Sequence, residues 1–398
     1  MPKDKFLPYI NIFCFFFTFI NIIFYFVGYD YLGVNPHIDY YDALVILSFC
    51  FSAYTGPTII QDLFFKYKQE YYWFFDSSTI DIFFLIFISL CIFLNTNNYI
   101  IDISFLIVLG SLVLGYKFFK QSLKTPLVWT SMVLGSIIGL LMTAYLFSWG
   151  KWQSPFLTEQ FALMHTDALF HPTIVHLFNT YKFSTTGLNS AIYLKYHWGT
   201  HLFFSGLSNL LHIHPVDTFS LLYPFYILPL SLKYIYIFSN RISSLFLFKE
   251  INPLLVISLF LIYYFNISLM HFLIWLSESV LFGIVITLMY LSILLRYSTL
   301  INSKFFLLFS FVICIVITTI KGPIGIILLG VLSWLMIRTY LFSKERRRWL
   351  FVLPLIIIGV YSFINMYLLQ DAHLGTSQNS IKNFFLKHSF SDICLNNM

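Results

Sequence analysis

Residues 150–215 form the one long polar stretch of the chain, and they concentrate the side chains that can do chemistry. Asp167 lies there in the run HTDALFH, which begins at His165 and ends at His171. A carboxylate beside imidazoles suits general base catalysis, in which Asp167 takes a proton from a hydroxyl group as a new bond forms. His171 can help to offset negative charge on a departing phosphate. The alternative is structural, with Asp167 capping a helix and the histidines anchoring the stretch at a membrane surface.

His197 and His201 form a second candidate pair in the same stretch. A helix is predicted from about 196 to 212, and residues four apart share one helix face, so both imidazoles can bind one ligand. A divalent cation such as Mg²⁺ or Mn²⁺ is one candidate for that ligand, with Asp167 adding an oxygen. The stretch has neither an HExxH pattern nor a cysteine, so we assign no metal ligands. We assign Asp167 and His171 to catalysis, and His165, His197 and His201 to substrate binding.

Two ionisable residues outside this stretch are further candidates for substrate binding. Glu278 lies in WLSESV, between two apolar runs, and Lys321 begins KGPIG at the end of another. Ionisable groups at a membrane boundary are costly to desolvate and are therefore often functional. Lys321 is expected to bind a phosphate, although snorkelling at a helix end would also place it there. Glu278 is either a substrate contact or a helix N-cap.

The rest of the sequence indicates a membrane protein. Its 398 residues are 59% hydrophobic and 10% charged, whereas soluble domains carry about 25% charged residues. Apolar runs of roughly 18 to 24 residues recur, each long enough to cross a bilayer as a helix. We therefore predict an all-α, polytopic transmembrane helix bundle of about 11 spans. The predicted spans are residues 8–28, 43–60, 78–95, 99–118, 126–149, 216–238, 253–273, 279–296, 304–320, 323–342 and 350–369.

The polar stretch then becomes one long loop at the bilayer surface, between the fifth and sixth spans. Its segment 155–171 mixes apolar and polar residues, as interfacial helices do. Pro172 can begin a second short helix and disfavours helical geometry at His171. We accordingly expect Asp167 near a helix end, with His171 at a bend just beyond it. The helix predicted from about 196 to 212 is expected to lie in the interface as well.

Basic residues orient the chain, because Lys and Arg accumulate in cytoplasmic loops. With the N-terminus in the cytoplasm, most of the 23 basic residues fall on that side, including the cluster KERRR at 344–348. We therefore predict a plasma-membrane protein whose 150–215 loop and C-terminus are external. The net charge of +6 follows from this orientation, so we expect no nucleic-acid partner. The basic residues left on the external side are Lys151, Lys182, Lys195, Lys321, Lys382 and Lys387.

These features resemble the GT-C superfamily of membrane glycosyltransferases, which includes the protein O-mannosyltransferases and the lipid A aminoarabinose transferases. The run TDALFH, followed by YHWGTH, resembles the acid and histidine motifs of bacterial members. The segment TTIKGPIG at 318–325 is similar to one in the aminoarabinose transferase branch. The resemblance covers about residues 126–370, which would form the core. Residues 1–125 would then be an N-terminal group of spans, and residues 371–398 a short external tail.

The resemblance implies transfer of a sugar, with inversion, from a polyprenyl-phosphate-linked donor to a glycan or glycolipid acceptor outside the cytoplasm. Asp167 would be the acidic residue of the external loop, acting as base or metal ligand, and Lys321 would contact the donor phosphate. Membrane lipid is an expected partner, and a divalent cation is the only cofactor implied. Many members carry two acids close together in this loop. Since no acid adjoins Asp167 here, Glu278 becomes the candidate for the second acid.

Two other classes of function stay open. A surface-polysaccharide polymerase or ligase also has many spans and a large external loop, but such enzymes rely on external arginines, and all arginines here are predicted inside. A transporter or flippase needs ionisable residues deep in the membrane and interrupted helices in paired halves. Asp81 and Lys233 are predicted near span ends, and we detect no internal repeat, so the sequence favours an enzyme over a transporter.

Overall fold

Helices make up every regular element in the described part of the chain, as predicted for an all-α protein. The computed structural model describes residues 6–32, 38–64, 73–93, 107–113, 115, 126–148, 166–182, 198–246, 278–297 and 303–341. The elements are α1 (Leu7–Leu32), α2 (Tyr40–Phe64), α3 (Ser77–Leu90), the 3₁₀-helix η2 (Cys91–Phe93), α5 (Pro126–Ser148), α6 (Thr166–Tyr181), α7 (Gly199–Leu211), α8 (Pro215–Leu222), the π-helix η5 (Tyr223–Ile227), α9 (Leu228–Phe246), α12 (Glu278–Arg296), α13 (Lys304–Ile320) and α14 (Gly322–Leu341).

Three of these helices are long and apolar enough to cross a membrane: Leu7–Val27, Tyr40–Phe64 and Ser279–Arg296. Shorter apolar helices lie in α3, α5, α13 and α14. A membrane protein is thereby supported, whereas the predicted total of about 11 spans is not established. The predicted spans 253–273 and 350–369 lie outside the described residues, as does the predicted tail 371–398.

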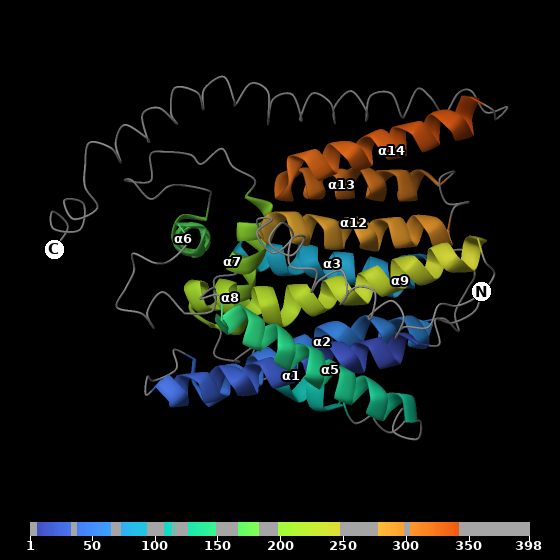
Figure 1. Ribbon diagram of the computed structural model, residues 1–398. Helices are drawn as coiled ribbons and strands as arrows, with labels where there is room; N and C mark the ends of the chain where they lie inside the picture. The colour runs from blue at the N-terminus through green and yellow to red at the C-terminus, as the bar shows by residue number, and fades with distance from the viewer. Residues whose placement is uncertain are drawn as a thin grey trace.

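The helices form a bundle with a central group and two flanks. In Figure 1, α3, α9 and α12 lie in the middle, with α1, α2 and α5 on one side and α13 and α14 on the other. The short helices α6, α7 and α8 gather at one end of the bundle. We call this the histidine end, because it carries His171 and His201. The opposite end, where Arg241 and Arg296 lie close together, is the arginine end.

Small residues let α5 pack closely against α1. Gly135 and Gly139 are four apart on α5, the spacing that brings helix backbones together in membranes. A Cβ built on Gly135 would lie 2.5 Å from the carbonyl oxygen of Phe13, and one on Gly139 would lie 2.9 Å from that of Phe17. Glycine is thus required at both positions by the neighbouring backbone.

The helical path from α8 through η5 to α9 is interrupted by prolines. Pro229 has no N–H to donate to the carbonyl of Phe225, one turn earlier. Two hydroxyls replace the missing donor: Thr18 Oγ1 donates to Phe225 O at 2.5 Å and Tyr54 Oη at 2.9 Å. The segment Tyr223–Ile227 widens into a π-helix, with the Leu228 N–H bonded to Tyr223 O. Such π segments often occur at functional sites.

The outer flanks present apolar side chains with no protein cover among the described residues. Phe305 on α13 is 71% exposed, and Ile327 on α14 is 68% exposed. Trp129 on α5 is similarly exposed. Apolar surface of this extent is costly in water and suits contact with lipid.

Candidate functional site

The structure corrects the predicted break at Pro172. α6 continues from Thr166 to Tyr181 with Pro172 inside it, so His171 is helical and does not lie at a bend. Pro172 leaves the carbonyl of Ala168 without its usual N–H donor. Packing offsets this loss, because Ile174 and Phe178 on the same helix are buried in an apolar cluster. The helix therefore directs His171 into the bundle, where its side chain is buried.

The second predicted helix is α7, and its surroundings differ from the prediction. Its bounds, Gly199–Leu211, lie close to the expected 196–212. It is not an interfacial helix, because nearly all of its residues are buried among α3, α6, α8 and α13. A Cβ at Gly206 would collide with the carbonyl of Ile88 on α3, so glycine permits this close packing. His201 thus points into protein.

His171 and His201 meet at the histidine end. His171 Nδ1 lies 2.8 Å from His201 Nε2, and the side chains are 4% and 1% exposed. One ring must donate an N–H and the other must accept it, so the two imidazoles cannot both be fully protonated in this geometry. Phe219 of α8 stacks on His171, with the ring centroids 5.9 Å apart. The pair is a buried unit able to hold or pass one proton.

Lys321 lies at the same end, between α13 and α14. Its extended backbone ends α13, and its N–H bonds to Ile317 O at 2.7 Å. A Cβ built on Gly199, the first residue of α7, would lie 2.7 Å from Thr319 Oγ1, so α7 begins directly against the end of α13. A Cβ on Gly283 of α12 would lie 3.5 Å from Lys321 Cβ. The half-exposed side chain of Lys321 therefore begins, at its Cβ atom, where α7, α12 and α13 meet.

The remaining predicted site residues are only partly placed. Asp167 lies in the first turn of α6, one turn before His171, and Glu278 is the first residue of α12; of both, the structure describes the backbone position alone. His165 and His197 lie outside the described residues, so the predicted convergence of His197 on His201 stays a prediction. Among the described residues, no three His, Cys, Asp or Glu side chains come together in a way that could hold a metal ion.

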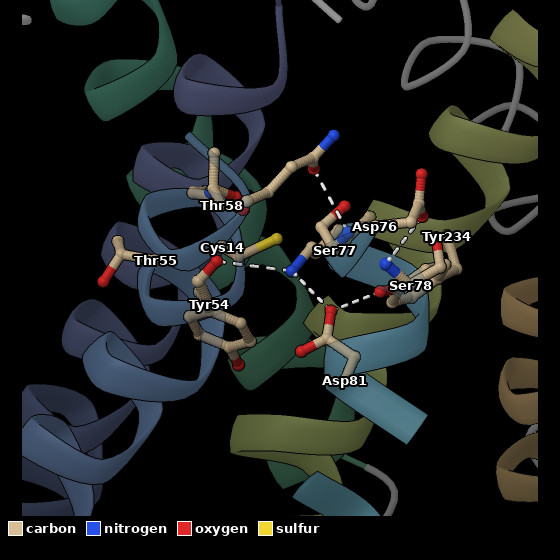
Figure 2. A network of polar contacts seen from close by, with 12 residues as sticks. Cys14, Tyr54, Thr55, Thr58, Asp76, Ser77, Ser78, Asp81 and Tyr234 are labelled. Carbon is tan, nitrogen blue, oxygen red and sulfur yellow. Dashed lines mark hydrogen bonds and ion pairs between the residues drawn. The ribbon is translucent and has the colours of Figure 1, made fainter. Parts of the chain in front are cut away.

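A second polar centre lies inside the bundle, and the sequence interpretation missed it. Lys233 of α9 is predicted near the end of a span, yet its side chain is 0% exposed. Its ammonium group donates to Asp81 Oδ2 at 3.0 Å and to the carbonyl of Tyr54 at 3.3 Å. The Tyr234 hydroxyl also donates to Asp81 Oδ2. Figure 2 shows Asp81 and Tyr234 facing each other beside Tyr54. A single charge inside an apolar run, as in STIDIFF and LSLKYIY, was the available signal.

At the arginine end, the carboxylate of Asp76 joins three helices. Asp76 precedes α3 and caps it, accepting the N–H of Ser78 at 3.0 Å. Arg241 and Arg296 also donate to Asp76, at 3.1 Å and 3.0 Å from Oδ2. Burial opposes ionisation of Asp76, but the two guanidinium groups outweigh it and hold the pKa of this carboxyl below its usual range. Asp76 therefore ties α3 to α9 and α12 as an anion.

Comparison of the chain with models of known protein families, with curated proteins and with solved structures yields no match.

Proposed function

We propose that this chain is an integral membrane glycosyltransferase that moves a sugar from a polyprenyl-phosphate-linked donor to a glycan or glycolipid acceptor outside the cytoplasm. The observation that carries the proposal is the grouping at the histidine end. The buried His171–His201 pair lies there with the half-exposed Lys321, and α6 and α12 begin there with Asp167 and Glu278 near their first residues. These are the residue types that transfer from a lipid phosphate requires.

The proposed reaction is a single displacement at the anomeric carbon of the donor sugar. Asp167 accepts the proton of the acceptor hydroxyl, whose oxygen forms the new glycosidic bond. The bond from the anomeric carbon to the phosphate oxygen breaks, and polyprenyl phosphate leaves with its electron pair. Lys321 balances the charge that develops on that phosphate. The buried His171–His201 pair positions the first turn of α6, which carries Asp167.

No step of this scheme passes through a metal ion. Within the described part of the chain, His171 and His201 bond to each other and no third ligand joins them. A divalent cation would need the carboxylates of Asp167 and Glu278. Transfer measured with and without a chelator of divalent cations tests whether such a cation takes part.

Label transfer in membranes tests the proposal. Membranes carrying the parent protein or Asp167→Asn, at matched expression, are given a set of polyprenyl-phosphate sugars labelled in the sugar. The parent should transfer label to an extracytoplasmic acceptor and release polyprenyl phosphate. Asp167→Asn should be slower by about 10² to 10⁴-fold, since it lacks the proton acceptor. The matched control is Asp217→Asn, which removes a carboxylate of α8 near His214.

Two outcomes would contradict the proposal in different ways. Near-parental transfer by Asp167→Asn would exclude Asp167 as the base and direct attention to Glu278. Absence of transfer by the parent, from every donor tried, would remove the glycosyltransferase assignment itself.

A transporter of a lipid-linked glycan precursor is the second candidate. The buried Asp81–Lys233 pair favours it, together with the interrupted helix around Pro229, because transporters place ionisable groups beside broken helices. A parent protein that moves a fluorescent polyprenyl-phosphate sugar across a vesicle membrane, without cleaving it, would establish this second function.

A further inference from the structure

The Asp81–Lys233 ion pair lies deep in the bundle, away from both ends. Lys233 precedes Arg241 by eight residues on α9, about 12 Å along the helix axis. Asp81 is 1% exposed and Lys233 is 0% exposed. Lys233 belongs to α9 and Asp81 to α3, while Tyr54 of α2 supplies the carbonyl that also accepts from Lys233. Charges kept at such depth in a membrane bundle are costly and commonly serve ion or proton movement.

Two irregular helices border the pair. Pro57 interrupts the hydrogen bonding of α2 just after Tyr54, and Pro229 interrupts that of α9 just before Lys233. Tyr54 connects the two irregular regions, because its carbonyl accepts from Lys233 while its hydroxyl donates to Phe225 O. The charge pair is thus built into the part of the bundle where backbone geometry is least regular.

Between Asp81 and the arginine end lie buried polar atoms that have no hydrogen-bond partner among the described residues. Asp81 Oδ1 has no hydrogen-bond partner among the described residues, nor do the buried hydroxyls of Ser77 and Ser78. Ser77 and Ser78 precede Asp81 by four and three residues, so they lie one turn away on its face of α3, as Figure 2 shows. The half-exposed Gln61 accepts the backbone N–H of Ser77 at 3.1 Å. Buried polar atoms without protein partners are the usual positions of internal water.

We propose that Asp81 is a proton-binding site, reached from the arginine end past Gln61, Ser77 and Ser78, with Lys233 and Tyr234 holding its ionised form. One proton from the aqueous phase joins Asp81 Oδ1, the oxygen that has no hydrogen-bond partner among the described residues, and converts the carboxylate to a carboxylic acid. Lys233 stays an ammonium group, so the site gains one positive charge. No other bond changes.

Protonation has a direct structural consequence. A neutral Asp81 no longer attracts Lys233, whose remaining partner is the Tyr54 carbonyl, so the tie between α3 and α9 weakens. The same helical path carries Phe219, which packs on His171, so the site is joined mechanically to the histidine end. The charged and titratable groups around Asp81 and its partners are Cys14 on α1, Cys50 and Tyr54 on α2, Asp76 before α3, Tyr226 in η5, Lys233, Tyr234 and Arg241 on α9, and Arg296 and Tyr297 at the end of α12.

A purely structural ion pair is the alternative, in which Asp81 stays ionised wherever the protein is folded. Infrared spectroscopy separates the two, because a protonated carboxylic acid absorbs apart from a carboxylate. The purified protein, made with isotope-labelled aspartate, is titrated over the pH range in which size-exclusion chromatography shows it folded. We expect an isotope-shifted carboxylic-acid band that grows as the pH falls. Asp81→Glu keeps the carboxyl group but removes it from the labelled set, so the component of the shifted band that belongs to Asp81 should disappear while the other aspartates still contribute.

Two further variants sharpen the test. Lys233→Met keeps the side-chain stem but removes the charge, so the acid band should move to higher pH by about 1 to 3 units, the usual effect of one close opposite charge. Asp42→Asn removes another labelled carboxylate, at the start of α2, and should leave the Asp81 component of the band unchanged. The proposal is overturned if the parent shows no titrating aspartic acid band while folded, or if the band persists unchanged in Asp81→Glu. If Asp81→Glu does not fold, Lys233→Met decides the matter, because Lys233 contacts Asp81 and only the Asp81 component of the band should then move.

Discussion

His171 of α6 and His201 of α7, thirty positions apart in the chain, are joined by a 2.8 Å contact between Nδ1 and Nε2. Each ring fixes the tautomer of the other, because one nitrogen must carry the shared hydrogen. Loss of either ring therefore changes the state of both.

Replacing the two histidines should show this coupling. We expect His171→Ala and His201→Ala each to lower sugar transfer about as much as the double variant, since residues that act as a unit are not additive. The measurement is the rate of label transfer at matched expression. His176→Ala is the control, because His176 is exposed on the same helix as His171. Losses that multiply in the double variant would show that the two rings act independently.

Lys321→Ala tests the proposed phosphate contact. Removing the charge should raise the donor concentration needed for half-maximal transfer by about 10-fold or more, as expected for one lost charge-assisted hydrogen bond. Lys321→Arg should restore much of the affinity. Lys182→Ala, at the exposed end of α6, should have no effect. Parental behaviour of Lys321→Ala at limiting donor would assign Lys321 to snorkelling instead.

Because α5 approaches α1 closely, a glycine substitution on α5 should lower stability, whereas the same substitution at an open position on α14 should not. Gly135→Ala places a methyl group 2.5 Å from the carbonyl oxygen of Phe13, so we expect destabilisation of about 1 to 3 kcal/mol. Gly330→Ala on α14 meets no atom of the described residues within 4 Å, and should be neutral or stabilising by up to about 1 kcal/mol. Thermal midpoints of both variants in detergent measure the difference. Equal midpoints would mean that α1 and α5 are not packed as described.

Protonation of Asp76 should lower the stability of the folded protein in acid. Its pKa is held below the usual range in the folded protein by Arg241 and Arg296. Its contribution to stability is therefore complete above the unfolded pKa, about 3.9, and is lost as the pH falls through the folded value. Thermal midpoints of the parent and Asp76→Asn should differ at neutral pH and converge below about pH 4. A difference that stays constant into acid would argue against an ionised Asp76.

The orientation can be tested with cysteines placed in two predicted loops. Ser190→Cys should react with a membrane-impermeant thiol reagent in intact cells, and Ser343→Cys should not, because the KERRR cluster follows Ser343. Permeabilised cells should label both positions and provide the control. Labelling at 343 and protection at 190 would reverse the topology and remove the lipid-linked donor from the proposed reaction.

The bounds of α13 and α14 were predicted best, whereas the predicted span 216–238 covers α8, η5 and only part of α9. The apolar runs 304–320 and 323–342 correspond to α13 and α14 almost residue for residue, because the length of a hydrophobic run sets the length of a membrane helix. Pro172 was misjudged for a related reason. Local geometry disfavours a helix there, whereas burial of Ile174 and Phe178, a tertiary effect, maintains it.

The polar centres were less predictable, because they depend on which helices become neighbours. His171 and His201 were both named from the sequence, but spacing favoured His197 as the partner of His201. Asp81 and Lys233 are separated by 152 positions, and no local pattern connects them. Asp81 and Lys233 are each predicted near a span end. Their pairing is not predictable, because a lone charge in an apolar run gives no information about its counter-ion.

This separation along the chain also sets an order of events during synthesis. At about 5 to 20 residues per second, roughly 8 to 30 s pass between translation of Asp81 and of Lys233. During that interval α3 is made and must be accommodated without its counter-ion, and its own run of 14 residues is short for a membrane span. The ribosome therefore delivers α3 with Asp81 still lacking Lys233, the cation that pairs with it in the folded protein. The buried ion pair of the bundle can therefore form only after α9 has been made, so a chain arrested before α9 carries Asp81 without its counter-ion.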